Sequence, residues 1–246
     1  MTTAEFDAEF DVLYNNITSN QAPGLNGYEK SVLLTKAQNQ ILSEYFNHKI
    51  DIDGGFDGSE ERQIDFSNLI VTEALTNIGS PEDYVRIDPR SFIFETSSEI
   101  THILNEFLDV IPQGTGVVNT LSVVPLSYNE YSRLMKKPYK FPQKGVAWRL
   151  INGSGRHIRC FELIAKDLAG NSVTYRLRYV RKPLPIILEN LSPLGVSIEN
   201  QTNILECELP SEIHHKILER AVTLAKIAWQ GGTMTQAGMA VEASKK

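Results

Sequence analysis

The sequence has few of the features that mark membrane, secreted or disulfide-stabilised proteins. Its 246 residues include only two cysteines, Cys160 and Cys207, which we expect to be free thiols. No apolar run approaches the roughly 20 residues of a membrane-spanning helix. Residues 1–11 are acidic and lack the apolar centre of a secretory signal. We therefore expect a chain that is made and kept in a cytoplasm, with no membrane partner.

Motifs for catalysis and for metal or nucleotide binding are also missing. The acidic segment 51–58 (DIDGGFDG) fails the helix-loop-helix calcium pattern, because Phe56 and Arg62 occupy the positions that need glycine and glutamate. No lysine follows Gly114 and Gly116, as a phosphate-binding loop requires. We predict no catalytic residue, no metal site and no cofactor, and hence no enzyme.

The chain has an ordinary globular composition in which the charges are separated along the sequence. Hydrophobic residues make up 41% and charged residues 22%, and the net charge is −6. Residues 1–100 have 18 acidic and six basic side chains, whereas residues 133–182 have 13 basic and two acidic. This asymmetry predicts partners or neighbouring subunits of opposite charge, unless the two regions neutralise each other within one chain.

Apolar residues repeat at helical spacing near both ends of the chain. Helices are expected over residues 3–16 and after Asn26, each preceded by a capping box. A C-terminal helix is expected to begin at Ser211 and to end before the glycines 231–232. The second helix has an apolar stripe made of Val32, Leu33, Ala37, Ile41, Leu42, Tyr45 and Phe46. We predict that the C-terminal helix covers this stripe, so that helices from the two ends form a bundle.

The middle of the chain changes to the two-residue period of β-strands. Strands are expected over 91–96, 117–124, 146–151, 157–165 and 172–180. A capping box at Ser127 predicts a short helix between the second and the third of them. The last three strands are predicted to form an antiparallel meander. In the final strand Tyr175 and Tyr179 alternate with Arg176 and Arg178, which predicts one apolar and one cationic face.

These elements predict an α+β fold with helices at both ends and a central antiparallel β region. Residues 1–50 together with 205–232 are expected to form a helical domain, and residues 51–204 a mainly β insertion domain. The segment 233–246 is small and polar, and we expect a mobile tail there.

The segment RKPLPIIL, residues 181–188, is expected to continue beyond the last strand as an edge or an extended arm. Pro183 and Pro185 have no amide hydrogen and cannot donate ladder hydrogen bonds.

Basic residues of the predicted meander leave two kinds of partner open. They are Arg149, Arg156, Arg159, Arg176, Arg178, Arg181 and Lys182. Interleaved with aromatic residues, they would suit phosphate contacts and base stacking. The two-residue alternation, however, buries the aromatic rings whenever the arginines face outward. A cationic surface that meets an acidic neighbour explains the same residues, so DNA and an acidic partner are both kept for Arg149, Arg156 and Arg159.

Four segments resemble a known group of proteins. They are APGLNGYEKSVLLTKAQ (22–38), WRL (148–150), RYVRKPLPIIL (178–188) and CELPSEIHHKILERAVTLAKIA (207–228). These segments resemble structural proteins of crAss-like bacteriophages, most of all the adaptor or ring protein beneath the portal. The resemblance covers both ends of the chain and much of its middle.

The resemblance implies a dodecameric homo-oligomeric ring that binds the portal protein on one side and neighbouring tail ring proteins on the other, with genomic DNA passing through its centre. The location would be the virion, at the head–tail junction or in the tail, after assembly in the bacterial host cytoplasm. Two alternatives remain: another tail or virion structural protein of this phage group, or a nucleic-acid-binding module that uses the basic meander.

Contacts between unlike faces of neighbouring subunits would close such a ring. We expect the basic meander or the 181–188 arm of one subunit to meet the acidic N-terminal surface of the next. The residues predicted to contact subunits or partners are Tyr28, Glu29, Lys30, Arg176, Arg178, Arg181, Lys182, Pro183, Pro185, His214 and His215.

Overall fold

A computed structural model describes most of the chain. The described residues are 1–17, 24–46, 64, 66–79, 85–96, 99–114, 116–137, 139, 141–154, 157–166, 168 and 170–229, without the side chains of 16–17, 152–154, 157–159 and 229. The predicted tail 233–246, the acidic segment 51–58 and Arg156 lie outside the described residues, as does the side chain of Arg159.

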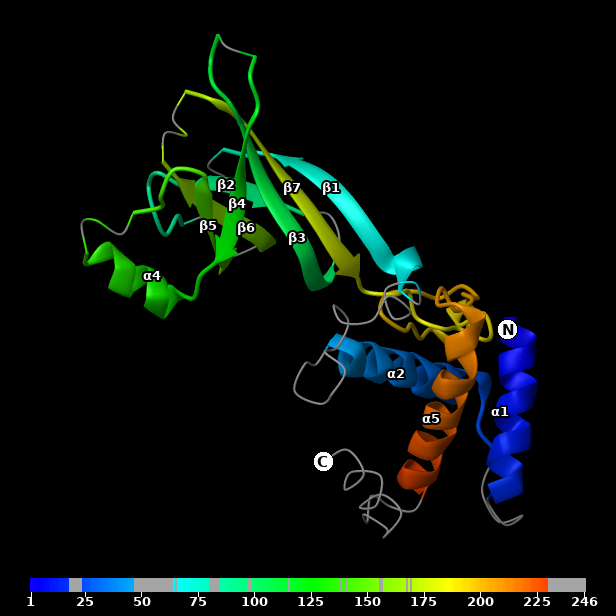
Figure 1. Ribbon diagram of the computed structural model, residues 1–246. Coiled ribbons are helices and arrows are strands. Elements are labelled where there is room, and N and C mark those ends of the chain that lie inside the picture. Colours follow the sequence, from blue (N-terminus) through cyan, green and yellow to red (C-terminus); the bar gives the residue numbers. More distant parts are fainter. Residues whose placement is uncertain are drawn as a thin grey trace. The chain divides into compact units, whose positions relative to one another are not determined.

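The chain folds into two compact units (Figure 1). The helical unit comprises Met1–Leu69 and Pro183–Lys246, and the sheet unit comprises Ile70–Lys182. The β domain was predicted over residues 51–204. In the structure, the segments on either side of Ile70–Lys182 belong to the helical unit.

Three helices form the frame of the helical unit: α1 (Thr3–Ile17), α2 (Gly27–Phe46) and α5 (Ser211–Trp229). The first two begin at the expected capping boxes. Thr2 N donates to Glu5 Oε2 at 2.8 Å, and Glu29 N donates to Asn26 Oδ1 at 2.8 Å. Such reciprocal bonds satisfy amides that the first helical turn leaves unpaired. Short 3-10 turns occur at Ser67–Leu69 (η2) and Ser192–Leu194 (η3).

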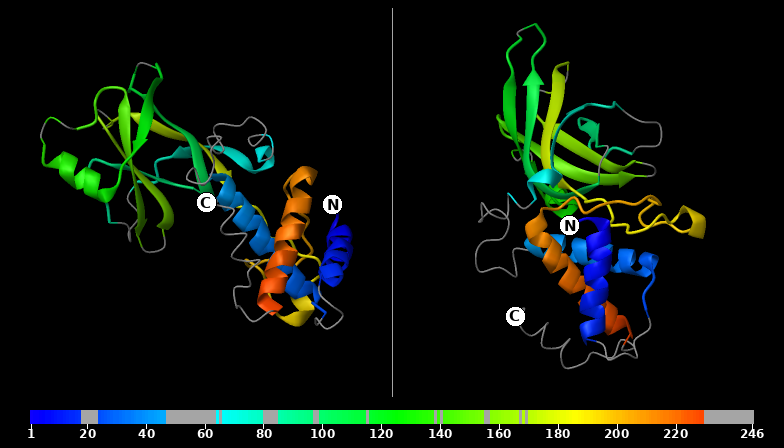
Figure 2. Two further views of the ribbon diagram at one scale, coloured as in Figure 1. Left: turned by 60° about the horizontal axis from the view of Figure 1, so that its bottom comes forward. Right: turned by 90° about the vertical axis from the view of Figure 1, so that its right-hand side faces the viewer.

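Residues of α1 and α2 both contact α5. The buried face of α1 consists of Phe6, Phe10 and Tyr14. α1 and α5 run side by side, while α2 lies across them (Figure 2). The predicted bundle is therefore not confirmed, although the two ends of the chain do pack together.

Seven strands make up the sheet of the second unit: β1 (Ile70–Thr76), β2 (Phe92–Glu95), β3 (Ile100–Ile111), β4 (Asn119–Pro125), β5 (Val146–Ser154), β6 (His157–Ala165) and β7 (Ser172–Arg181). Their order in the sheet is β1-β7-β3-β4-β5-β6-β2. The β4–β5 pair is parallel and the other pairs are antiparallel, so the sheet is mixed rather than antiparallel as predicted.

The predicted meander is wrong at its third strand. β5 and β6 form the expected antiparallel hairpin, but β7 pairs with β1 and β3 instead of β6. Neither β1 nor β3 was expected from the sequence. β3 pairs with β7 from Ile100 opposite Arg181 to Ile111 opposite Ser172, which satisfies β7 along its whole length.

The sheet curls until its two edges nearly meet. Ile78 N, just after β1, donates to Ile93 O of β2 at 3.0 Å. Ile93 N in turn donates to the side chain of Asn77 at 3.1 Å. Since β1 and β2 are the two ends of the strand order, these bonds make the sheet a nearly closed barrel.

Each face of the sheet has its own apolar cluster. The larger cluster includes Leu108, Phe161, Leu163, Tyr175 and Tyr179. On the other face Trp148, Leu150 and Ile164 are covered by the segment around helix α4 (Tyr128–Met135), which contributes Tyr131 and Leu134. The capping box predicted at Ser127 is present at the start of α4.

Candidate interaction surfaces

The 181–188 arm is extended, as predicted, and its inner part is held by helix α2. Leu188 N donates to Ser31 Oγ at 3.0 Å, and Ile186 N donates to Thr35 Oγ1 at 3.1 Å. Gln38 Nε2 donates to Leu184 O at 2.9 Å. Two residues of an extended chain rise about 6.6 Å, which is close to the rise of about 5.4 Å of one α-helical turn. Alternate residues of the arm therefore lie opposite successive turns of α2.

This ladder explains which face of α2 is buried. Ser31, Thr35 and Gln38 are buried, while Val32, expected in the apolar stripe, is 38% exposed. The stripe was thus predicted incorrectly at its first residues, because the arm offers hydrogen-bonding groups that polar side chains satisfy. Pro183 and Pro185 are buried within the helical unit and are not exposed for a subunit contact.

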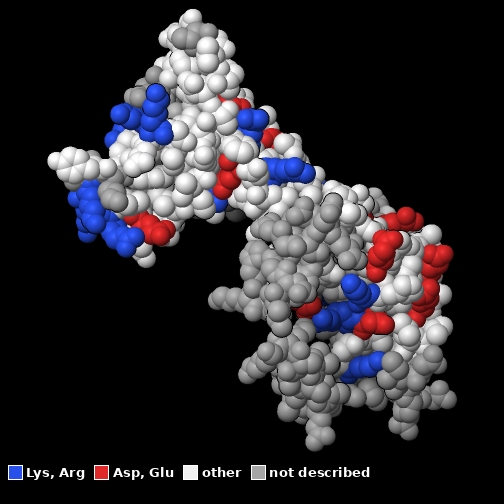
Figure 3. Space-filling model, viewed as in Figure 1, with Lys and Arg blue, Asp and Glu red and all other residues white. Residues whose placement is uncertain are grey.

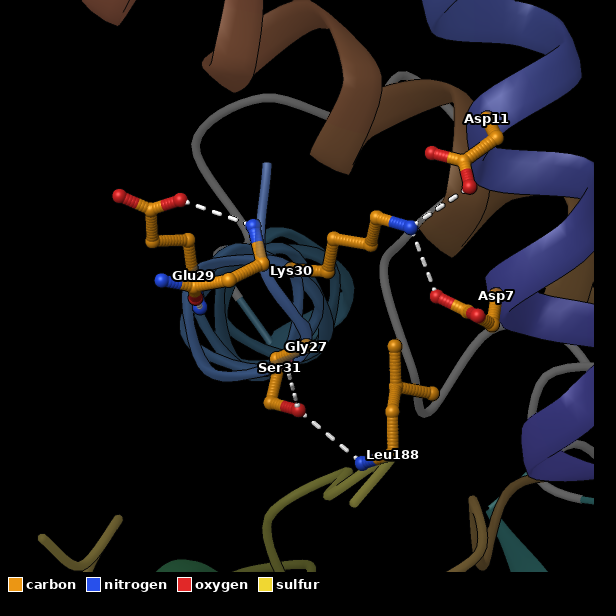
Figure 4. A network of polar contacts seen from close by, with 8 residues as sticks. Asp7, Asp11, Gly27, Glu29, Lys30, Ser31 and Leu188 are labelled. Carbon is orange, nitrogen blue, oxygen red and sulfur yellow. Dashed lines mark hydrogen bonds and ion pairs between the residues drawn. The ribbon is translucent and has the colours of Figure 1, made fainter. Parts of the chain in front are cut away.

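The start of α2 contains three predicted contact residues, all engaged within the chain. Lys30 is 5% exposed, and its Nζ lies 2.8 Å from both Asp7 Oδ1 and Asp11 Oδ2 of α1 (Figure 4). Burial by itself lowers the pKa of Lys30, but the hydrogen bonds to the two carboxylates outweigh it and raise the pKa above its ordinary value.

Glu29 and Tyr28 also have structural partners. Glu29 accepts a hydrogen bond from Asn26 N in the capping box. Tyr28 packs against the cluster of Ile187, Leu191 and Ile198. Lys30 is thus buried and Tyr28 half-buried in the helical unit, and Glu29 is the most accessible of the three.

The two histidines of α5 differ in environment. His214 is buried against Phe6, with Nε2 2.8 Å from Leu209 O and Nδ1 2.8 Å from Met1 N. Burial is the main cause that lowers its pKa. His215 is exposed, and its Nδ1 lies 3.9 Å from Glu9. Of the pair, only His215 is placed for contact with another molecule.

The cationic face predicted on β7 exists but is partly neutralised. Tyr175 and Tyr179 point into the apolar cluster, while Arg176 and Arg178 are exposed. Arg176 Nε forms a 2.6 Å ion pair with Asp109 of the adjacent strand, and its guanidinium stacks on Phe107.

At the end of β7 the two remaining basic residues are half-buried. Arg181 donates to Lys182 O at 3.4 Å, and Lys182 Nζ lies 3.9 Å from Glu99. Arg178 is therefore the residue of this group with the most accessible charge.

Arg149, predicted to contact DNA or an acidic partner, is inside the sheet unit. It is 6% exposed, and its Nε lies 2.8 Å from Glu106 Oε2, which also accepts a 2.6 Å hydrogen bond from Tyr175. Arg149 therefore faces the interior, where Glu106 of the unpredicted strand β3 supplies its counter-charge, and its contact with DNA or an acidic partner stays a prediction.

A second basic surface was not singled out from the sequence. The α4 surface, as we call it, consists of Arg133, Lys136, Lys137, Tyr139 and Lys144, all exposed. Among the described residues, the side chains of Lys136, Lys137 and Lys144 have no ion pair or hydrogen bond. A signal was available, because residues 131–161 contain eight Lys and Arg and no Asp or Glu.

The described part of the chain offers little for metal or thiol chemistry. It contains no group of three His, Cys, Asp or Glu that could hold a metal ion. Both cysteines are free, and burial raises the pKa of each to about 11, which keeps the thiols protonated and unreactive. No helix within the described ranges is long and apolar enough to cross a membrane.

Comparison with known proteins identifies the chain over almost its full length. The model of the phage tail ring protein 3/4 family matches residues 1–237. The chain is 46% identical over 236 residues to ring protein 4/5 of Bacteroides phage crAss001, with 94% of each chain covered. It is 34% identical over 232 residues to ring protein 3 of the same phage, covering 93% of this chain and 96% of the relative.

These matches define a structural ring protein of phage virions. The chain belongs to the phage tail ring protein 3/4 family. The resemblance to ring proteins of crAss-like phages is confirmed, and the position next to the portal stays a prediction.

Proposed function

We propose that the chain forms a homo-oligomeric ring in the head–tail connector of a crAss-like phage, between the portal and further tail ring proteins, with genomic DNA passing through the centre. The observation that carries this proposal is the family match over residues 1–237 together with two relatives named as ring proteins. A dodecamer is the expected stoichiometry, and assembly in the host cytoplasm is the expected route. The role is structural, without cofactor, metal or catalysis.

Charge separation between the two units supports ring closure through unlike faces. The helical unit has 19 acidic and nine basic residues, whereas the sheet unit has 15 basic and 11 acidic. A ring of identical subunits closes when one face of each subunit binds a different face of the next. Opposite charges on such faces favour this pairing and disfavour contacts between like faces.

The structure gives less support to a nucleic-acid-binding module built on the predicted basic meander. Arg149 is buried, Arg176 is paired with Asp109, and Tyr175 and Tyr179 lie in the apolar cluster. Few of the charges and none of these rings are placed for phosphate contacts and base stacking.

The test is mass measurement of the purified protein alone, with the portal complex and with duplex DNA. A ring-sized assembly that forms with the portal, and little binding of free DNA, is the expected result. Salt-sensitive DNA binding without portal binding would instead indicate the nucleic-acid module. Assembly with other tail proteins but not with the portal would indicate that the ring lies elsewhere in the tail.

A further inference from the structure

The exposed basic side chains of the α4 surface lie on and next to a helix that is held on the sheet. α4 begins at a capping box, and Tyr131 on its inner side donates a 2.9 Å hydrogen bond to Asp88. Asp88 is buried and held by Arg90, and burial together with this hydrogen bond raises the pKa of Tyr131 to about 12, so that the hydroxyl stays a donor. The helix is thereby fixed on the sheet and presents its outer side to solvent.

Exposed apolar side chains lie on α4 and among the lysines that follow it. Tyr139 is 96% exposed, and Tyr128 and Met135 are also exposed. Protein interfaces are enriched in aromatic residues and methionine, whereas contacts to a phosphate backbone come mainly from charged and polar groups. The mixture of Lys136 and Lys137 with these apolar side chains therefore fits an acidic protein surface better than nucleic acid.

An acidic surface of this kind exists on the helical unit. Glu5 and Glu9 lie on the outside of α1, and Glu212 lies at the start of α5. The 3.9 Å approach of Glu9 to His215 brings the α1 and α5 groups together. Figure 3 shows acidic side chains gathered over the α1 side of the helical unit, and basic side chains gathered around α4 on the sheet unit.

We infer that the α4 surface of one copy of this chain binds the Glu5, Glu9 and Glu212 surface of a second copy. Because every copy has both surfaces, each can bind one neighbour on either side, which is the arrangement that a ring requires. The inference rests on the proposed ring function and assigns the subunit contact to α4 in place of the buried arm. It also predicts that assembly weakens as the salt concentration rises.

Charge reversal on each side provides the test. One variant carries Lys136→Glu and Lys137→Glu, and the other carries Glu9→Lys and Glu212→Lys. A control with Lys36→Glu and Lys226→Glu changes lysines of α2 and α5 instead of the α4 surface and alters the net charge as much as the first variant does. Circular dichroism and melting of each variant establish that the fold is kept.

The readout is native mass measurement of the full chain, alone and with the portal complex. Each reversal variant is expected to lose at least tenfold in its affinity for neighbouring copies, while the control assembles as wild type does. An equimolar mixture of the two variants should assemble again, with strict alternation, because every contact then joins opposite charges. A single chain with all four reversals should also assemble.

Three results would overturn the inference. Assembly of the α4 variant at wild-type concentration would show that the contact lies elsewhere. Failure of the mixture to assemble, with both variants folded, would show that these surfaces do not meet. Unchanged rings with loss of duplex DNA binding would assign the α4 surface to nucleic acid. By contrast, a wild-type chain that stays monomeric with the portal present would contradict the proposed ring function itself.

Discussion

The arm ladder of the helical unit and the Arg149 pair of the sheet unit bury different kinds of polar group. In the helical unit, Thr35 and its neighbours on α2 bond the backbone of the 181–188 arm through neutral groups. In the sheet unit, the ion pair of Arg149 with Glu106 is buried between strands. An unmatched neutral group costs less than an unmatched buried charge. These two networks should therefore differ in their response to the loss of one partner.

The buried ion pair should show the largest effect. Arg149→Met leaves Glu106 charged inside the sheet unit, and we expect the free energy of unfolding to fall by about 3–5 kcal/mol. Urea unfolding in a Trp229→Phe background measures it, since Trp148 then reports on the sheet unit alone. Adding Glu106→Gln should recover part of the loss. A loss below about 1 kcal/mol would contradict the role of this pair.

The polar ladder of the helical unit should show an intermediate effect. Thr35→Val keeps the shape of the side chain but leaves Ile186 N unpaired, which should cost about 1–3 kcal/mol. Hydrogen exchange at the Ile186 amide should become faster. Thr223→Val is the matched control, because that hydroxyl only bonds Glu219 O within α5 and is exposed. Equal effects of the two substitutions would refute the ladder.

His214 should make the helical unit sensitive to acid. Its pKa is lowered in the folded state, so the unfolded chain binds a proton more readily once the pH falls below about 6.5. Stability from neutral His214 is complete above that pH and declines below it, by at most about 1.4 kcal/mol per pH unit. Thermal unfolding of His214→Gln should depend less on pH between 5 and 7. The exposed His215→Gln should keep the wild-type profile.

The ion pair of the half-exposed Arg176 with Asp109 should matter least. Arg176→Ala is expected to lower stability by only about 0.2–1 kcal/mol, since the guanidinium is half-exposed. Comparison with Arg149→Met in the same unfolding assay separates the two arginine pairs of the sheet unit. A loss of stability as large as that of Arg149→Met would show that the exposure of the arginine does not determine how much each ion pair contributes.

Helices were largely predictable because their signals are local. The capping boxes at Thr2, Asn26 and Ser127 all form as the sequence indicates. The buried face of α2 was harder to predict, because Ser31, Thr35 and Gln38 are buried by an arm that is distant in the sequence. A polar residue that binds a segment about 150 residues away gives no periodic signal.

The order of the strands in the sheet was harder to predict from the sequence than the strands themselves. β3 escaped prediction because Glu106 occupies an inward position where an apolar residue is expected, and its partners Arg149 and Tyr175 come from other strands. Without β3, the sequential pairing of β6 with β7 was the natural expectation. The same omission made Arg149 look like a surface residue.

Candidate contacts were predicted mainly from motif-rich segments, and several of them are internal. Lys30, Pro183, Pro185 and His214 stabilise the helical unit. The exposed lysines of the α4 surface lie within residues 133–182, whose excess of basic residues was noted without predicting this surface. Accessibility depends on the fold, which a segment's composition does not specify.

Labelled virions provide the most direct test of the structural role. Electron microscopy of phage particles that carry a gold-labelled version of this chain would locate it. The ring assignment predicts several labels arranged around the axis at the head–tail junction or in the tail. Virions that contain no label, or that carry it away from this axis, would contradict it.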